Sequence, residues 1–88
     1  MNVQFRASFE SDLRAIREKT VLTRVSAAIV SVESADSIAR VRNVKKLRGG
    51  AHYYRIRIGD YRIGLTVTGE EAVFVRVLHR KDLYRYFP

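Results

Sequence analysis

Two alternating runs joined by Gly59-Asp60 constrain the fold of this chain more than any other feature. A Gly beside an Asp favours a two-residue hairpin turn, because Gly adopts a positive φ without a Cβ clash. Side chains alternate along strands, so this turn sets Arg57 opposite Arg62 and puts Arg55 on the same face. Like charges directly opposite each other in a sheet are destabilising. The hairpin therefore predicts an exposed face whose arginines are held in place for an anion.

The elements before this hairpin are predicted to be one strand and two helices. Residues 2–6 alternate apolar with polar side chains, as a half-buried strand does. A first helix follows, because apolar residues recur at helical spacing, at Phe9, Leu13 and Ile16. Thr20 is a residue type that caps helices, and a second helical pattern starts there.

The rest of the chain is predicted to be a three-stranded antiparallel meander. Residues 43–50 form a basic connector. Three strands follow it, at residues 52–58, 61–68 and 72–79. Residues 81–86 fit either a single helical turn or an extended tail. We therefore expect residues 1–88 to form one α+β domain of order β-α-α-β-β-β, with both helices on one face of the sheet.

The loop between the last two strands decides which face Arg76 takes. A three-residue loop at residues 69–71 puts Arg76 and Arg80 on the face of the hairpin arginines. The core face then carries Val73, Val75 and Val77. A two-residue loop reverses the strand and buries Arg76, which is costly for an unpaired charge. We therefore expect the three-residue loop and an arginine face left exposed.

Positive charge is concentrated in the second half of the chain, and the formal net charge is +8. Residues 1–36 carry five basic and five acidic residues, whereas residues 37–88 carry twelve basic and four acidic ones. A one-sided field of this kind attracts polyanions and supplies sequence-independent affinity. Nucleic acid is therefore the favoured partner, and an acidic protein is the second choice.

Two absences narrow the class of protein further. No cysteine is present, which excludes a disulfide framework and a cysteine zinc site. No apolar run reaches the roughly 18 residues that a membrane helix needs, and the first residues lack the pattern of a secretory signal. We expect a soluble, cytoplasmic protein that does not bind membranes.

Three segments carry motifs of a known family. They are Lys-Leu-Arg-Gly at residues 46–49, the hairpin run at residues 54–63, and Val-Leu-His-Arg-Lys-Asp-Leu-Tyr-Arg at residues 77–85. Together they resemble RelE/ParE toxins, the small toxic halves of bacterial type II toxin–antitoxin systems, over nearly the whole chain. The Gly-Asp-Tyr-Arg hairpin followed by a His-Arg-x-x-x-Tyr ending is more similar to the RelE branch than to the ParE branch.

The resemblance implies a ribosome-dependent endoribonuclease that inhibits translation. RelE-like toxins enter the ribosomal A site and cleave mRNA there by attack of a 2′-hydroxyl on the adjacent phosphate, with no metal or organic cofactor. The resemblance also implies a cognate antitoxin, contacts with the ribosome and mRNA, and operator DNA reached only through the toxin–antitoxin complex. We expect the free toxin to be a monomer.

The resemblance also assigns catalytic positions, at Arg55, Arg57, Arg62, Arg80 and Tyr84, with Tyr86 as the alternative tyrosine. Guanidinium groups suit this chemistry, because in-line attack builds negative charge on the phosphate oxygens. The best-known RelE has lysines where this chain has Arg55 and Arg57. An arginine, whose pKa exceeds about 12, is a poor base. Tyr84 or His79 is therefore the candidate proton carrier.

A further set of residues is expected to bind RNA or the ribosome rather than to react. Charge runs usually form solvated surfaces, but basic runs in such a protein suit RNA phosphates. The set comprises Arg40, Arg42, Lys45, Lys46, Arg48, His52, Arg76 and Lys81.

Two alternatives to this function stay open. A ParE-like toxin would poison DNA gyrase and cut nothing, and it would need neither the arginines nor a C-terminal tyrosine. A catalytically inactive module would use the basic face only to dock an acidic antitoxin or DNA.

Overall fold

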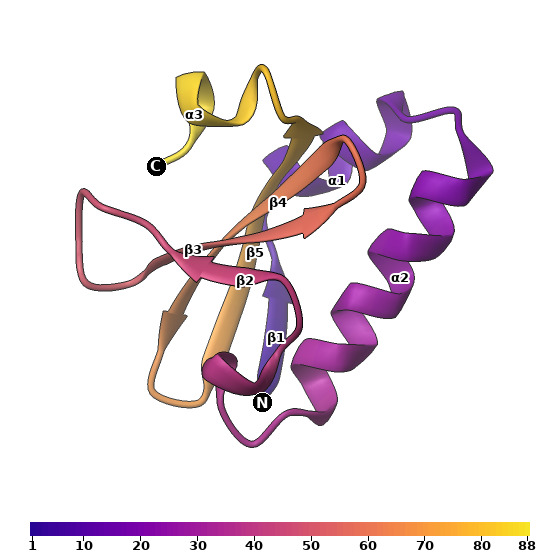
Figure 1. Cartoon of the computed structure of the whole chain (residues 1–88). Helices are drawn as coiled ribbons and strands as arrows, with labels where there is room; N and C mark the ends of the chain where they lie inside the picture. The colour runs from indigo at the N-terminus through magenta and orange to yellow at the C-terminus, as the bar shows by residue number, and fades with distance from the viewer.

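The computed structural model describes all of residues 1–88 as three helices on a five-stranded sheet (Figure 1). In chain order the elements are β1 (Asn2–Phe5), α1 (Ala7–Ala15), α2 (Lys19–Ser34), the 3₁₀ turn η1 (Ile38–Arg40), β2 (Val44–Lys46), β3 (Tyr53–Ile58), β4 (Tyr61–Thr68), β5 (Glu71–His79) and α3 (Leu83–Tyr86). The strand order is β1-β5-β4-β3-β2, in which β1 is parallel to β5 and all other neighbours are antiparallel. The α+β prediction is confirmed, although the sheet has one strand more than expected.

The additional strand, β2, lies inside the segment predicted to be a basic connector. It pairs antiparallel with β3, so that Val44 lies opposite Ile56 and Lys45 lies opposite Arg55. Only Val44 marks the buried side of this short strand, and one apolar residue is too few to reveal an alternating pattern. The consequence is that Lys45 joins the face of the sheet that carries the arginines.

The turn between β4 and β5 has two residues rather than the predicted three. It consists of Gly69 and Glu70, and pairing resumes directly on either side of it. The prediction of Val73 and Val75 in the core is therefore wrong. The side chains that enter the core from this part of β5 are Ala72 and Phe74.

A bulge farther along β5 restores the orientation that was predicted for Arg76. Leu65 pairs with Phe74, but its neighbour Gly64 pairs with Arg76, so β5 carries one extra residue at this point. A bulge of this kind shifts the alternation by one position. As a result Val77 is buried in the core, as predicted, and Arg76 leaves the core face despite the two-residue turn.

The long helices pack on one face of the sheet around a common core, as predicted. Phe9 of α1, and Val25 and Val32 of α2, are almost completely buried there. The Phe9 ring lies 5.4 Å from the Phe74 ring between centroids. Burial of large apolar side chains is the main favourable contribution to folding. The expected cap, Thr20, is instead the second residue of α2, which has no side-chain cap.

Side chains of helix α1 hydrogen-bond to the backbone of β5 beyond the point where β1 ends. The Ser8 hydroxyl donates to the carbonyl of Val75 at 2.6 Å. Asp12 accepts the backbone N–H of Val77 at 3.0 Å, and it also accepts two hydrogen bonds from the Arg76 guanidinium at 2.7 and 3.0 Å. These contacts satisfy backbone groups that an open strand edge leaves without partners.

The C-terminal segment covers part of the other face of the sheet. Leu83 is fully buried and Phe87 is 2% exposed, although neither belongs to the main core. A Cβ atom added at Gly64 would lie 2.7 Å from the Phe87 ring, so this ring rests directly on β4. The prediction that the arginine face is left exposed is therefore wrong around Gly64. No helix in the structure is both long and apolar enough to cross a bilayer.

Candidate functional site

Four arginines on the face opposite α1 and α2 form the candidate site, and we call Arg55, Arg57, Arg62 and Arg80 the arginine cluster. The hairpin register sets Arg57 directly opposite Arg62, as predicted. Arg55 precedes Arg57 by two positions and so shares its face of β3. Arg80 follows β5 and is anchored by its backbone N–H, which donates to the carbonyl of Asp60 at 2.7 Å.

Arg62 experiences the charges of all the other members of the cluster. Burial, together with the positive charges of Arg55, Arg57 and Arg80, lowers the pKa of its guanidinium, and Tyr84 acts in the opposite direction. These groups are therefore close enough to interact electrostatically. Mutual repulsion of this kind is relieved when an anion binds between the cations.

Backbone carbonyls hold two of these guanidinium groups in place. Arg62 donates to the carbonyls of Gly59 and Tyr61 at 2.7 and 2.9 Å. Arg55 donates to the carbonyl of Asn43 at 2.8 Å, while its Nε is buried without a partner. A buried donor that lacks a partner is costly, and an anion supplies strong charge-assisted bonds. The cluster is thus a set of partly fixed cations with hydrogen-bond donors to spare, which suits a phosphate-like group.

The two C-terminal tyrosines have different surroundings. Tyr84 is 59% exposed and interacts electrostatically with Arg62. The Tyr86 ring instead lies against the guanidinium of Arg76, 5.2 Å from its central carbon, and Arg76 is already bound by Asp12. Tyr84 is therefore the tyrosine that the fold brings to the arginine cluster.

His79 lies on the opposite side of the sheet from the arginine cluster. It pairs with Tyr61, whose ring meets the imidazole edge to face at 5.7 Å between centroids. Its Nδ1 accepts the backbone N–H of Lys81 at 3.2 Å. The structure therefore does not bring the candidate proton carrier His79 to the arginine cluster.

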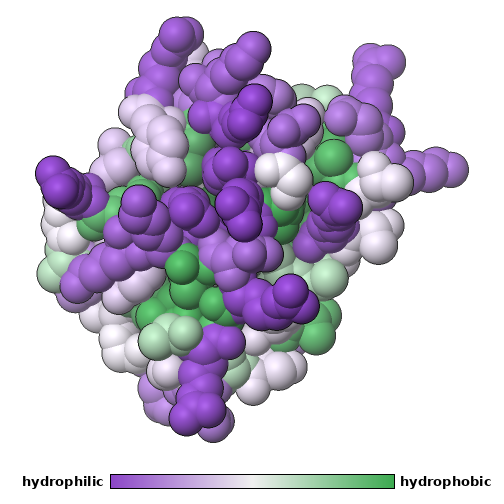
Figure 2. All heavy atoms as spheres, in the orientation of Figure 1, coloured by the Kyte–Doolittle hydropathy of each residue, from purple (hydrophilic) through white to green (hydrophobic).

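Of the residues predicted to bind RNA, one forms an ion pair within the protein and the others are exposed to solvent. Arg76 differs from the others because it forms an ion pair with Asp12, and its binding to RNA stays a prediction. The exposed members are Arg40, Arg42, Lys45, Lys46, Arg48, His52 and Lys81. Figure 2 shows that hydrophilic side chains cover most of one view of the molecule, with apolar patches between them.

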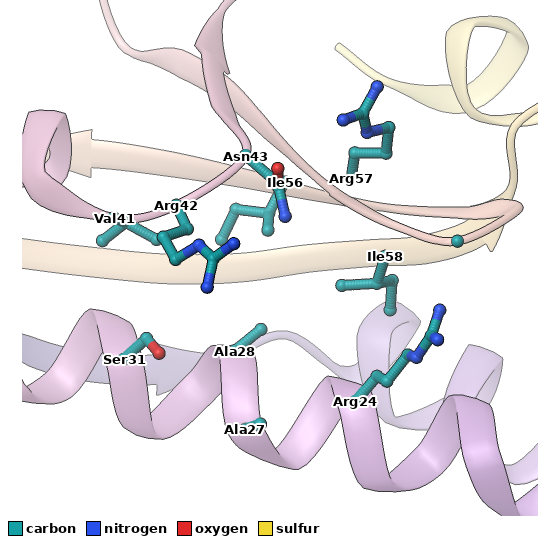
Figure 3. A pocket seen from close by; sticks show the side chains of 11 residues that line it. Arg24, Ala27, Ala28, Ser31, Val41, Arg42, Asn43, Ile56, Arg57 and Ile58 are labelled. Carbon is teal, nitrogen blue, oxygen red and sulfur yellow. The ribbon is translucent and has the colours of Figure 1, made fainter.

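A groove of about 600 Å³ lies between α2 and β3, on the side of the sheet away from the arginine cluster (Figure 3). Apolar residues of the sheet side, small residues of α2 and three arginines line it, among them Val41, Ile56, Ile58, Ala28, Arg24, Arg42 and Arg57. The side chain of Arg57 points away from this groove. No group of three or more His, Cys, Asp or Glu residues is placed to hold a metal ion.

Comparison with known proteins identifies the family. The model of the ParE toxin of the type II toxin–antitoxin system parDE matches residues 3–84. Toxin RelE3 of Methanocaldococcus jannaschii is 39% identical over 89 residues, which cover 100% of both chains. This chain belongs to the RelE/ParE family of type II toxin–antitoxin toxins, as its motifs predicted.

Solved structures agree with this assignment. A chain of the RelB-RelE antitoxin-toxin complex from Methanococcus jannaschii superimposes with a TM-score of 0.81 at 38% identity, over 97% of this chain and 99% of that chain. The archaeal RelE-RelB complex from Pyrococcus horikoshii OT3 gives a TM-score of 0.74 at 21% identity, over 93% and 97% of the two chains. The first likeness confirms the RelE branch, and the second confirms the fold.

Proposed function

We propose that this chain is a RelE-like toxin that cleaves mRNA on the ribosome, through its own side chains and without a metal ion. The observation that carries the proposal is the arginine cluster with Tyr84 beside it, on a chain 39% identical to a RelE toxin. Such a set of cations suits a reaction whose transition state gathers negative charge on phosphate oxygens.

The proposed reaction needs one proton to leave and another to arrive. The 2′-oxygen loses its proton and bonds to phosphorus, the bond from phosphorus to the 5′-oxygen breaks, and the 5′-oxygen gains a proton. The products are a 2′,3′-cyclic phosphate and a 5′-hydroxyl. Arg62 and its neighbours stabilise the charged phosphate by bidentate hydrogen bonds. Tyr84 transfers one of these two protons and solvent water transfers the other, because Tyr84 is exposed to solvent.

The proposed partners are a cognate antitoxin and the ribosome with its mRNA. Relatives solved as RelB-RelE complexes support the antitoxin. The net charge of +8 supports binding to ribosomal RNA, since counterion release from phosphates supplies affinity without sequence preference.

Primer extension on a defined mRNA in purified translating ribosomes tests this function. The wild-type protein is expected to produce cuts within the A-site codon, and Arg80→Ala is expected to lose them. Arg14→Ala is the matched control, because Arg14 is an exposed arginine on α1, outside the arginine cluster. Absence of cuts from folded wild-type protein would refute the proposal.

One observation favours a second function, namely that the matching family model is that of a ParE toxin. A ParE-like protein would inhibit DNA gyrase. A supercoiling assay with purified gyrase separates the two, because a ribosome-dependent nuclease leaves supercoiling unchanged. Expression in cells gives a parallel readout, in which an SOS response indicates gyrase and an abrupt stop in translation indicates mRNA cleavage.

A further inference from the structure

The C-terminal turn at residues 83–87 is attached to the sheet by side chains that have no role in the proposed chemistry. These side chains are Leu83, Tyr86 and Phe87. Tyr84 projects from the same turn and is 59% exposed. An exposed side chain on a short turn has no packing of its own to hold it. Its position therefore depends on the anchors on either side.

Phe87 is the anchor that packs directly on the sheet, on the face that carries the arginine cluster. Its ring occupies a slot that only glycine leaves open, because a Cβ atom at Gly64 would approach the ring to 2.7 Å. Gly64 pairs with Arg55 on one side and with Arg76 on the other, so the ring rests within that row. Tyr53 supports the ring edge to face, with 5.6 Å between centroids.

We propose that Phe87 is a positioning residue of the cleavage site, whose ring on Gly64 holds the turn that carries Tyr84 on the arginine face of the sheet. This inference rests on the proposed ribonuclease function. The connection between the two residues is short, since the backbone N–H of Phe87 donates to the carbonyl of Leu83 at 2.8 Å and closes the turn that carries Tyr84. Movement of the ring is therefore passed on to the tyrosine.

The chemical step is expected to be far more sensitive to this contact than ribosome binding. A misplacement of a reacting group by about 1 Å can lower a rate about a hundredfold. Ribosome binding instead relies on exposed basic residues that lie outside the turn, such as Arg42 and Lys45. The proposal thus predicts a loss of rate without a matching loss of affinity.

Single-turnover cleavage of mRNA in programmed ribosomes measures both quantities. Phe87→Ala is expected to lower the rate constant at saturating toxin about a hundredfold, with the half-saturating concentration unchanged within about threefold. Phe87→Leu, which keeps an apolar side chain in the slot, is expected to recover most of the rate. Gly64→Ala is expected to lower the cleavage rate constant in the wild-type background. It is expected to cause no further loss of rate in Phe87→Ala, since both changes act through one contact.

Nuclear magnetic resonance of tyrosine-labelled toxin tests the positioning without any ribosome. The Tyr84 signal, assigned with Tyr84→Phe, is expected to shift in Phe87→Ala. The Tyr61 signal is expected to stay in place, because Tyr61 packs against the main core on the other side of the sheet. A purely structural role for Phe87 would lower the unfolding temperature and leave the Tyr84 signal of the folded protein unchanged.

Phe5→Ala is the matched control for loss of an aromatic ring. Phe5 stacks on Phe9 and Phe74 on the core side of the sheet, opposite the turn, so its removal is expected to lower stability and to preserve both cleavage and the Tyr84 signal. Wild-type rates in Phe87→Ala, or an unmoved Tyr84 signal, would overturn the positioning role. Absence of cleavage by the wild-type protein, with a Tyr84 signal that still moves in Phe87→Ala, would overturn the proposed function and leave the contact standing.

Discussion

Arg76 and Arg62 lie on the same face of the sheet, yet their surroundings give them opposite properties. The hydrogen bonds and charge of Asp12 raise the pKa of Arg76. Burial and neighbouring arginines lower the pKa of Arg62. The charge of Arg76 is already balanced by Asp12 within the fold. The charge of Arg62 is surrounded by like charges, so a bound anion would relieve its repulsion. The sequence could not separate the two, because Asp12 is 64 residues from Arg76 along the chain.

Asp12→Ala is expected to lower the free energy of unfolding by about 2 kcal/mol, because the Arg76 guanidinium and the Val77 N–H both lose their acceptor. Partial exposure of Arg76 keeps the loss below that of a fully buried pair. Urea denaturation at neutral pH measures the change. The control is Glu10→Ala, an exposed acid on the same helix, and equal midpoints for the two variants would contradict the prediction.

Strands β2, β3 and β4 hold like charges against each other at two places. Arg57 faces Arg62, and Lys45 faces Arg55, across neighbouring strands. Directly opposed like charges cost up to about 1 kcal/mol relative to neutral pairs. Residues that lower the stability of a fold are typical of functional sites. Other residues at the same positions would make the protein more stable but would remove the function.

Arg57→Thr is therefore expected to stabilise the protein by about 0.5 kcal/mol while it weakens mRNA cleavage, since threonine suits a strand and ends the repulsion. Thermal unfolding at low salt measures the gain. High salt is expected to shrink it, because ions screen exposed charges. A lower unfolding temperature for Arg57→Thr at low salt would show that the opposed arginines are not a source of strain.

The elements with repeating patterns were predictable, and those that depend on distant contacts were not. The hairpin alternates over two full strands, so both the faces and the Arg57–Arg62 pairing are confirmed. β2 offers only Val44 as an apolar marker, and the bulge in β5 leaves no sign in the local pattern. The slot for Phe87 depends on Gly64, and nothing in the sequence around Gly64 indicates that an aromatic ring packs on it. The arginine cluster was predicted by motif and alternation, and the alternation that placed Val77 in the core also places His79 on that side, as the observed register confirms.

At the scale of the whole molecule, the two faces of the sheet carry different kinds of residue. One face buries the core beneath α1 and α2, and the other carries the arginine cluster and the C-terminal turn. The basic residues of the second half of the chain extend from the cluster along β2, where Lys45 continues the charged row. A broad basic surface of this kind suits the many phosphates of a folded RNA, as the proposed function requires.

Binding to ribosomes is expected to weaken steadily as salt rises, with a linear relation between the logarithms of affinity and salt concentration. Lys45→Gln is expected to reduce the slope by about one, because it removes one phosphate contact. Arg14→Gln on α1 is the control and is expected to leave the slope unchanged. Filter binding or sedimentation across a salt series measures both, and identical slopes would exclude Lys45 from the interface.

The pairing of β1 with β5 also determines when, during synthesis of the chain, the sheet can be completed. Asn2 pairs with Glu71 and Phe5 pairs with Phe74, so the first strand to be synthesised has no sheet partner until the last strand has been made. Arg80 and Tyr84 follow later still. Pairings between such distant parts of a chain also form slowly. A nascent chain therefore has neither a finished sheet nor an assembled site until β5 and the C-terminal turn have been made, so the site forms late in the synthesis of this domain.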